Sequence, residues 1–352
     1  MRLFCSYIFG QEVDQYYHPA NKLANMYLFL FNFFFSFFLF YLSIQLLVLL
    51  LALTTVIVFL KSDLTNWLRL QDQNPCACEK CLSEDNLLAL HRLNHSVEPF
   101  LTANTNVSAD AFRWWKRLQH EQRDFNYYKS TVHKLFKLFP PVVDYGEPSS
   151  DSCRTCAVVG NSANLKGSHY GSLIDYQDVV MRMNTAPIKN YESDVGTKTT
   201  HRVMYPESAM DLDNSTHLVL FPFKINDLKW VIQAFTTGFY GRSYAPIKSK
   251  IKANKNLVMV VNPAFMRYVH EIWLKKKGDY PSTGFMALIL ALHICDEVSV
   301  FGYGADNDGN WSHYFETLKR KNFKTGPHPG KHEYALIHEL AQNKTIRLYK
   351  GW

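Results

Sequence analysis

No charged residue occurs between Lys22 and Lys61. The stretch from Tyr27 to Leu60 within this gap is dense in Phe and Leu. A cleaved signal peptide has an apolar core of only about 7–15 residues, and this run shows no clear small-residue cleavage site before Lys61. A transmembrane helix needs about 20 apolar residues. The absence of charge therefore predicts a single membrane anchor rather than a removable leader.

Cysteine is uncommon, with seven residues in the chain, and all but Cys5 follow the apolar run. The six that follow it are Cys76, Cys78, Cys81, Cys153, Cys156 and Cys295. An even set of this kind favours disulfides in an oxidising compartment. The Cys-x-x-Cys spacings within it also suit a zinc site, which is the alternative interpretation.

Glycosylation sequons of the form Asn-x-Ser/Thr also lie after the apolar run. They begin at Asn94, Asn106, Asn214, Asn310 and Asn343. The positive charges on the two sides of the run nearly balance, so they do not decide its orientation. The sequons and cysteines instead predict a single-pass type II protein whose C-terminal part is luminal. Nucleic acid is then excluded as a partner, and the formal net charge of +7 suits an anionic small molecule or solubility alone.

The composition divides the chain into four segments. We expect a cytosolic tail at 1–26, the transmembrane signal anchor at 27–60, a polar stem with the cysteine cluster at 61–110 and a luminal domain at 111–352. No internal repeat or low-complexity tract occurs outside the anchor. The luminal part is long enough for one large domain rather than several.

Short apolar strands alternate with helical segments along the luminal domain. The predicted strands are 156–159, 179–183, 218–222, 257–261 and 298–301, and the predicted helices are 112–119, 227–235, 264–274 and 285–294. This alternation predicts an α/β domain with a largely parallel sheet. Such sheets bind their ligands at the carboxyl ends of the strands.

Two glycine-containing blocks lie where strands or loops meet helices. Gly160-Asn161-Ser162 follows the first strand, and Asn184 follows the second. The Asn side chains can hydrogen-bond a nucleotide or phosphate, although the same residues also make ordinary turns. Pro281-Ser282-Thr283-Gly284 begins an apolar helix, with Tyr280 placed beside it to contact a sugar. The hydroxyls either cap this helix or, with its N–H groups, also bind a carboxylate or phosphate.

His313 and His328 stand out among the 14 histidines by their surroundings. His313 lies among aromatic residues, and His328 lies between Pro327 and Pro329, five residues before Glu333. A histidine on a rigid loop suits a general base with a pKa near neutrality. A structural or surface role is the alternative for each.

In their order along the chain, these motifs resemble the sialylmotifs of the eukaryotic sialyltransferases. The large motif spans 153–200, the small motif 281–304 and the third motif 313–316, and the last is the pair His328 and Glu333. The chain is most similar to the β-galactoside α2,3-sialyltransferases, and among them to the subfamily that acts on Galβ1,3GalNAc of O-glycans and glycolipids. The resemblance implies a single catalytic domain with a variant of the GT-A-like, Rossmann-like α/β fold.

The resemblance also implies a role for individual residues. The reaction would be an inverting transfer of sialic acid from CMP-sialic acid to the 3-hydroxyl of galactose. His328 would be the general base, and His313 would bind the phosphate and stabilise the leaving group. The residues implied in donor binding are Asn161, Asn184, Tyr205, Ser282, Thr283 and Gly284. Those implied in acceptor binding are Gln119, Tyr244 and Tyr280.

Further expectations follow from the same resemblance. The implied disulfides are Cys76–Cys81, Cys78–Cys153 and Cys156–Cys295. The implied location is the Golgi membrane, with no metal or other cofactor. The patterns Asp211-Leu-Asp213 and Asp306-Asn-Asp308 match an Asp-x-Asp cation motif, and we attribute the match to chance. We expect glycans at the sequons outside the site, which are Asn94, Asn106, Asn214 and Asn343, and an unmodified Asn310.

Three alternatives stay open from the sequence. One is a Galβ1,3/4GlcNAc acceptor, since Ser312 and Phe315 depart from the family pattern. Another is a catalytically silent Golgi glycan-binding protein of the same fold, against which the intact His313 and His328 argue. The third is a metal-dependent glycosyltransferase with a different donor.

Overall fold

The computed structural model describes residues 19–71, 77–78, 92–140, 151–317 and 326–351. The chain divides into two units, Met1–Leu70 and Gln71–Trp352, and each is described by itself.

The first unit contains all but the last residue of the helix α1, Pro19–Gln71. Its segment Phe33–Lys61 has 29 residues with a mean hydropathy of 2.6 and is the one candidate membrane span among the described residues. At 1.5 Å per residue this segment is about 44 Å long, which exceeds the hydrocarbon thickness of about 30 Å and allows a tilted span. The segment lies largely within the predicted anchor at 27–60, and its length and composition suggest a single-pass membrane anchor.

The second unit is built on a seven-stranded parallel sheet with the order β5-β4-β3-β2-β1-β6-β7. The strands are β1 Thr155–Val159, β2 Val179–Met183, β3 His201–Met204, β4 His217–Leu220, β5 Val258–Val260, β6 Glu297–Phe301 and β7 Arg347–Tyr349. The predicted α/β class with a largely parallel sheet is confirmed. The chain leaves β1 towards β2 and later returns to the other side of β1 with β6. This reversal is a topological switch point, where open α/β sheets form their ligand crevice.

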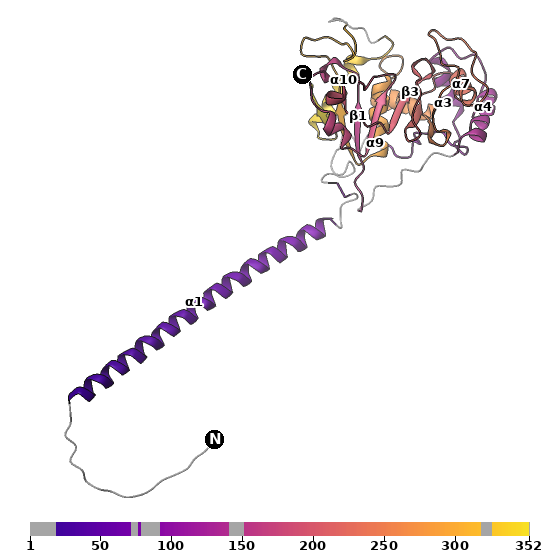
Figure 1. Cartoon of the computed structure of the whole chain (residues 1–352). Coiled ribbons are helices and arrows are strands. Elements are labelled where there is room, and N and C mark those ends of the chain that lie inside the picture. Colours follow the sequence, from indigo (N-terminus) through magenta and orange to yellow (C-terminus); the bar gives the residue numbers. More distant parts are fainter. Residues whose placement is uncertain (1–18, 72–76, 79–91, 141–150, 318–325, 352) are drawn as a thin grey trace. The chain divides into compact units, whose positions relative to one another are not determined.

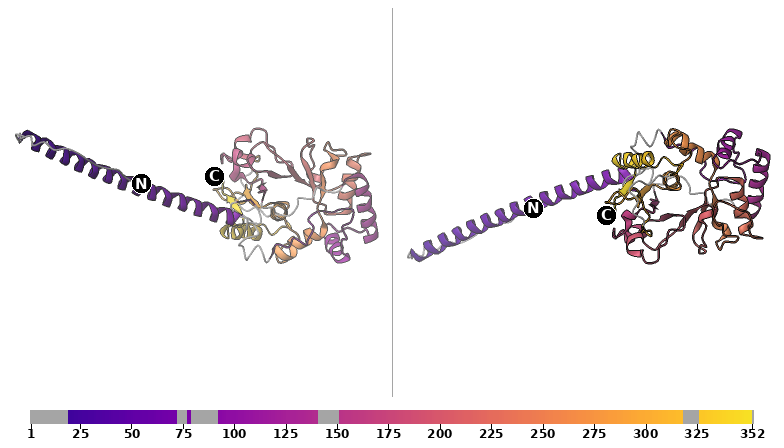
Figure 2. Two further views of the ribbon diagram at one scale, coloured as in Figure 1. Left: turned by 90° about the horizontal axis from the view of Figure 1, so that it is seen from below. Right: turned by 90° about the horizontal axis from the view of Figure 1, so that it is seen from above.

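Helices lie against the sheet and at its two ends (Figures 1 and 2). They are α3 Ala109–Arg117, α4 Phe125–Leu138, α5 Gly171–Asp175, α6 Glu192–Val195, α7 Ile225–Ala234, α8 Pro263–Tyr268, α9 Thr283–Ile294 and α10 Gly330–Gln342, with a π-helical turn η4 Val269–Trp273 after α8. Figure 1 shows α3, α4 and α7 grouped at one end of the sheet and α10 at the other. The short 3-10 turns are η1 Ala163–Leu165, η2 Pro206–Ser208 and η3 Lys255–Leu257.

Helix α9 is the central helix of the core because its sequence is apolar on nearly every side. Most of its residues from Phe285 onwards are buried, and it contacts β1, β2, β3 and β6. Ser282 caps its N-terminus, with the hydroxyl oxygen accepting from the N–H of Phe285. A helix that is hydrophobic all round is a buried helix. Its capped end is thereby fixed beside the carboxyl ends of the strands.

Five of the strands lie where the sequence predicts them, but β3 and β7 were not predicted. Strand β3 begins with His201 and Arg202, which are polar although both are 3% exposed. The helices α4 and α10 were also missed. The helix predicted over 264–274 is present, but it changes from α to π geometry at Val269.

The folded unit starts earlier than the predicted boundary between stem and domain at 110. Phe100, Leu101 and Val107 are buried in the main core. Phe100 forms an antiparallel bridge with Val261, and the N–H of Leu101 donates to the carbonyl of Val260 over 2.8 Å. A few apolar residues in this otherwise polar segment therefore cover the edge strand β5. Edge strands are commonly covered by a loop or helix in this way.

Two of the expected disulfides are present. Cys78 is bonded to Cys153 and Cys156 is bonded to Cys295. The expected pair Cys76–Cys81 lies outside the described residues. The second bond joins β1 to the C-terminal end of α9 across 139 residues. Because their sulfur atoms form two disulfide bonds, Cys78, Cys153, Cys156 and Cys295 are not zinc ligands.

The sequons differ in accessibility. The four candidates for glycosylation, Asn94, Asn106, Asn214 and Asn343, are exposed. Asn310 is 6% exposed, and its side-chain amide donates to a carboxylate oxygen of Asp306 over 3.0 Å. A glycan on Asn310 would have to break this contact, so the burial supports an unmodified Asn310.

Candidate active site

A cavity of about 470 Å³ lies at the carboxyl ends of β1 and β6, at the switch point of the sheet. It is lined by every residue that the resemblance implies in donor binding or catalysis, which are Asn161, Asn184, Tyr205, Ser282, Thr283, Gly284, His313 and His328. Segments separated by more than a hundred residues of chain meet here because β1 and β6 are neighbours.

The floor of the cavity requires glycine at two positions. The N–H of Gly160 donates to the carbonyl of Phe301 over 2.7 Å, and the N–H of Ser162 donates to that of Gly302 over 3.0 Å. A Cβ atom on Gly160 would lie 2.2 Å from the carbonyl oxygen of Gly302. Gly302 itself has a φ of 68°, in the region that favours glycine. The two loops therefore approach closely only without side chains at these residues.

Two asparagine side chains present polar atoms to the cavity. The Oδ1 atoms of Asn161 and Asn184 are buried and have no hydrogen-bond partner within the described ranges. Asn184 has a φ of 56°, which Asn tolerates better than most residues, and the Arg202 guanidinium donates to its carbonyl over 3.2 Å. Buried polar atoms are rarely left unpaired in native proteins. These two are placed to accept hydrogen bonds from a ligand.

The N-terminus of α9 supplies backbone donors to the cavity. The N–H groups in the first turn of a helix have no partner inside the helix, and the helix dipole makes this end favourable for an anion. The Ser282 hydroxyl is occupied as the cap, so the cap interpretation is confirmed. Thr283 and Gly284 also line the cavity. This end of α9 can therefore bind a carboxylate or phosphate through the backbone.

Glu333 on α10 holds that helix end in place. Its Oε1 atom accepts from the N–H of Ser282 over 2.7 Å, and the residue is 5% exposed. Burial raises the pKa of this carboxyl group, while the hydrogen bonds from Ser282 lower it. The partner of His328 in the last sequence motif is thus a positioning residue that joins α10 to α9.

His328 has the geometry of a general base. Its Nδ1 atom lies 3.1 Å from the carbonyl oxygen of Tyr280. A carbonyl can only accept, so Nδ1 carries the hydrogen and Nε2 carries the lone pair of the neutral ring. Burial lowers the pKa of His328, although the Tyr280 carbonyl and Asp279 raise it in part. The ring is thereby kept neutral and able to accept a proton.

His313 is held against the loop that follows β1. Ser162 and His313 form an antiparallel bridge, and the N–H of Tyr314 donates to the carbonyl of Asn161 over 2.9 Å. The His313 Nδ1 atom lies 2.9 Å from a carboxylate oxygen of Glu316, and the side chain is 48% exposed. The third sequence motif thus places an oriented imidazole beside Asn161 at the mouth of the cavity.

Of the residues implied in acceptor binding, Tyr280 lies beside His328 and Gln119 contacts Tyr280. The Gln119 side-chain amide donates to the Tyr280 hydroxyl over 3.4 Å, and the ring centroids of Tyr280 and His328 are 4.9 Å apart. Tyr244 is 75% exposed. Desolvation raises the pKa of Tyr244, and the neighbouring Tyr205 and Glu207 raise it further. Tyr244 therefore lies close enough to Tyr205, which lines the cavity, to interact with it electrostatically.

Three aromatic residues of the cavity were missed by sequence reasoning. These are Tyr303, Trp311 and Tyr334. The Tyr303 hydroxyl donates to the carbonyl of Gly284 over 2.8 Å, and the rings of Trp311 and Tyr334 are 5.7 Å apart. Tyr303 lies between Gly302 and Gly304 directly after β6, and this position is the signal that could have indicated it. No pattern in the sequence points to the other two.

The Asp-x-Asp patterns make local hydrogen bonds. Asp306 accepts from the backbone and the side chain of Asn310. Asp211 pairs with Lys248 over 3.0 Å, and Asp213 accepts from Ser215 and Thr216. The carboxylates of Asp306, Asp211 and Asp213 therefore take part in turns and a surface ion pair. Among the described residues, one group close enough to share a metal is Cys78, Cys153 and Glu297, and two of its members are disulfide-bonded.

The chain resembles known proteins over most of its length. Residues 100–345 match glycosyltransferase family 29 (sialyltransferase). Two relatives are CMP-N-acetylneuraminate-beta-galactosamide-alpha-2,3-sialyltransferase 1 of Sus scrofa, 46% identical over 283 residues, and that of Homo sapiens, 43% identical over 292 residues. These matches cover 79% and 81% of this chain and 82% and 86% of the relatives.

A solved structure shares the fold as well as the sequence. It is the crystal structure of a mammalian sialyltransferase in complex with Gal-beta-1-3GalNAc-ortho-nitrophenol. The TM-score is 0.73 at 45% sequence identity, and the match covers 79% of this chain and all of the other. The sheet, the cavity and the ordered motifs agree with these similarities, and the chain belongs to glycosyltransferase family 29, the sialyltransferases.

Proposed function

We propose that this protein transfers sialic acid from CMP-sialic acid to the 3-hydroxyl of the terminal galactose in Galβ1,3GalNAc. The observation that carries this proposal is the position of His328, with a proton-accepting nitrogen in the same cavity as Asn161, Asn184 and the N-terminus of α9. The names of the relatives support the donor, the galactose-containing acceptor and the α2,3 linkage.

The transfer would be a single displacement with inversion at the sugar. The Nε2 atom of His328 accepts the proton of the galactose 3-hydroxyl while its oxygen bonds to the anomeric carbon. The bond from that carbon to the phosphate oxygen breaks, and CMP leaves with the electron pair. General-base catalysis contributes about 10²–10⁴-fold. The lowered pKa of His328 supports this role because it keeps the ring unprotonated near neutrality.

The leaving group would be stabilised by groups that are already in place. His313 faces the cavity from the loop beside Asn161, and Glu316 orients its ring. The N–H groups at the start of α9 favour negative charge. Preorganised donors of this kind stabilise a transition state because they need no rearrangement as charge develops. The monoester phosphate of CMP then needs no metal ion, and we propose a metal-independent reaction.

The proposed location is the Golgi membrane, with the catalytic unit in the lumen. The apolar segment of α1 supports a single-pass anchor. The disulfides Cys78–Cys153 and Cys156–Cys295 support an oxidising compartment. The sequence expectation of a type II orientation is kept in this proposal.

The test is a transfer assay with the segment 61–352 secreted from a eukaryotic host. Transfer from CMP-sialic acid to Galβ1,3GalNAc is measured with and without chelator, and the linkage is determined in the product. We expect chelator-resistant α2,3 transfer that His328→Ala lowers by about 10²–10⁴-fold. Preferential transfer to Galβ1,3/4GlcNAc would correct the acceptor. Binding without any transfer, by folded protein, would refute the enzyme proposal, and loss of transfer in chelator would refute metal independence.

A further inference from the structure

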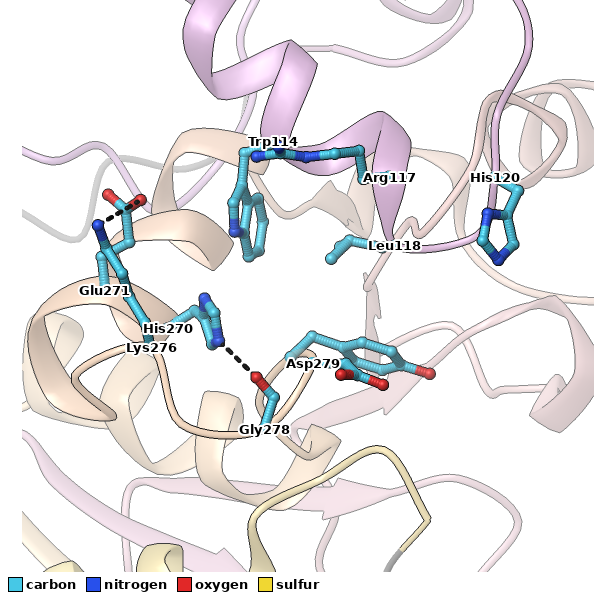
Figure 3. A pocket seen from close by; sticks show the side chains of 10 residues that line it. Trp114, Arg117, Leu118, His120, His270, Glu271, Lys276, Gly278 and Asp279 are labelled. Atoms are coloured by element: carbon cyan, nitrogen blue, oxygen red, sulfur yellow. Dashed lines mark hydrogen bonds and ion pairs between the residues drawn. The ribbon is translucent and has the colours of Figure 1, made fainter.

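A second cavity, of about 600 Å³, lies between α3 and the segment that joins η4 to α9 (Figure 3). It is lined by Trp114, Arg117, Leu118, His120, His270, Glu271, Lys276, Gly278, Asp279 and Tyr280. Figure 3 shows Trp114 and Leu118 pointing from α3 towards His270 and Gly278 opposite. None of the residues implied in donor binding lines this cavity.

Tyr280 connects the second cavity to the proposed reaction. It lines the second cavity, while its ring packs edge-on against His328 with centroids 4.9 Å apart. Its hydroxyl accepts from the side chain of Gln119, which follows the C-terminal end of α3. An acceptor held by Gln119 and Tyr280, with its galactose at His328, therefore lies at the wall of the second cavity.

His270 offers an unpaired hydrogen-bond acceptor in the wall of this cavity. The residue is 7% exposed, and its Nε2 atom lies 3.0 Å from the carbonyl oxygen of Gly278. Nε2 must donate to that carbonyl, so the Nδ1 atom of the neutral ring is an acceptor. Nδ1 is buried and has no hydrogen-bond partner among the residues that the structure describes. A ligand in this cavity satisfies it by presenting a hydroxyl or N–H group.

The rest of the wall suits a sugar ring. The indole of Trp114 and the imidazole of His270 have centroids 5.6 Å apart, and the C–H groups of a pyranose pack against the electron-rich face of such rings. Arg117 and Lys276 offer donors and Asp279 offers acceptors at the rim. A sugar hydroxyl both donates and accepts, so it can use both kinds of partner.

The charged groups around the cavity leave Arg117 available. Glu271 pairs with Arg267 over 3.0 Å and with Lys276 over 4.0 Å. Arg117 has no ion pair within the described ranges of the chain.

The lining of the second cavity comes from helices and a loop, with no strand edge that could pair with an extended backbone. A peptide would therefore lack its usual main-chain partners here.

We propose that the second cavity is a subsite for a third sugar of the acceptor, one attached to the Galβ1,3GalNAc disaccharide on the side away from the transferred sialic acid. This inference rests on the proposed function. The subsite would make a branched or extended glycan a better acceptor than the disaccharide alone. His270 would accept a hydrogen bond from that sugar, and Trp114 would pack against its ring.

The test compares three acceptors on the secreted 61–352 enzyme. They are Galβ1,3GalNAc, the trisaccharide in which GlcNAc is β1,6-linked to the GalNAc, and a short glycopeptide carrying the disaccharide on threonine. The readout is the ratio of kcat/KM for each extended acceptor to that for the disaccharide. The variants are Arg117→Ala and His270→Phe, with Arg113→Ala as the matched control. Arg113 lies on the same helix, is exposed and pairs with Asp110.

We expect the trisaccharide ratio to fall about 5- to 10-fold in each subsite variant, as the loss of one hydrogen bond implies, and to keep its wild-type value in Arg113→Ala. Unchanged ratios in Arg117→Ala and His270→Phe would overturn the subsite. A fall for the glycopeptide but not for the trisaccharide would overturn the sugar in favour of a peptide. Arg117→Ala changes an exposed side chain, so it keeps the test valid if His270→Phe does not fold. Absence of disaccharide transfer in the wild type refutes the proposed function instead, so the two failures are distinguishable.

Discussion

Removal of the Glu333 carboxylate tests whether the last sequence motif positions the donor site rather than reacting. In Glu333→Ala the N–H of Ser282 loses an acceptor 2.7 Å away, in a place where the glutamate is 5% exposed. A hydrogen bond to a charged group contributes about 1.5–3 kcal/mol net, and an unsatisfied buried group costs a similar amount. Each 1.4 kcal/mol changes an equilibrium constant about tenfold. The substitution should therefore lower the equilibrium constants for folding and for donor binding by about 10- to 150-fold in total.

The loss divides between stability and donor binding. For a domain of this size each kcal/mol lowers Tm by about 2–4 °C, so we expect a fall of about 3–12 °C if the whole loss is in stability. Loosening of Ser282, Thr283 and Gly284 should also raise KM for CMP-sialic acid. Glu333→Gln keeps an acceptor oxygen and should lose less on both measures. Differential scanning calorimetry and initial rates over a donor titration measure the two parts.

The matched control is Glu339→Ala on the same helix. Glu339 is 41% exposed and lies 3.9 Å from Arg92, and exposed pairs of this kind contribute about 0–1 kcal/mol. If Glu333→Ala changes Tm and the donor KM no more than Glu339→Ala does, the positioning role is wrong. If Glu333→Gln is as damaging as Glu333→Ala in kcat alone, the carboxylate takes part in the chemistry, and the reasoning fails in the other direction.

Three further predictions concern packing and pH. Gly160→Ala places a Cβ 2.2 Å from the Gly302 carbonyl oxygen and should destabilise the unit by about 1–3 kcal/mol, with a raised donor KM; wild-type values in both would contradict the close approach. Burial lowers the pKa of His328, so kcat/KM should hold as pH falls through about 6.5 and decline only at lower pH; a decline already complete above that value would exclude a neutral buried base. Burial, then His217, lowers the pKa of His201 to about 3. The unfolded chain then binds the proton first, so stability falls as pH drops from about 6.5 towards 3; Tm measured near pH 7 and near pH 5 should fall less in His201→Gln, and an equal fall in both proteins would rule this histidine out as a source of acid sensitivity.

Much of the fold was predictable because five of its strands are short, largely apolar runs that are followed by turn-forming residues such as glycine, asparagine or proline. Val179–Met183 was predicted with the bounds that β2 has. Strand β3 was not, because its first two residues are a histidine and an arginine whose burial depends on partners elsewhere. Arg202 donates to the carbonyls of Asn184 and Ala186, and no local pattern reports such contacts.

Much of the candidate site was also predictable, because its residues lie in short motifs rather than in a periodic pattern. Asn161, Ser282 and His328 lie in short motifs whose order along the chain is specific, and the parallel sheet brings their strand and helix ends together. Trp311 and Tyr334 line the same cavity but lie just outside the motif residues, next to 313–316 and Glu333. The role of Glu333 also depends on a contact with the backbone of Ser282. Contacts between distant segments set these features, and they become visible only in three dimensions.

The pairing of β1 with β6 has a consequence for how the protein is made. Thr155 of β1 and Glu297 of β6 are register partners, so one edge of β1 stays unpaired until the late part of the chain that carries β6 has been synthesised. Pairing across so long a loop is slow, and an unpaired edge invites aggregation. The cavity does not exist in any nascent chain that ends before Phe301. A chain truncated before Phe301 would therefore lack the cavity and leave one edge of β1 unpaired.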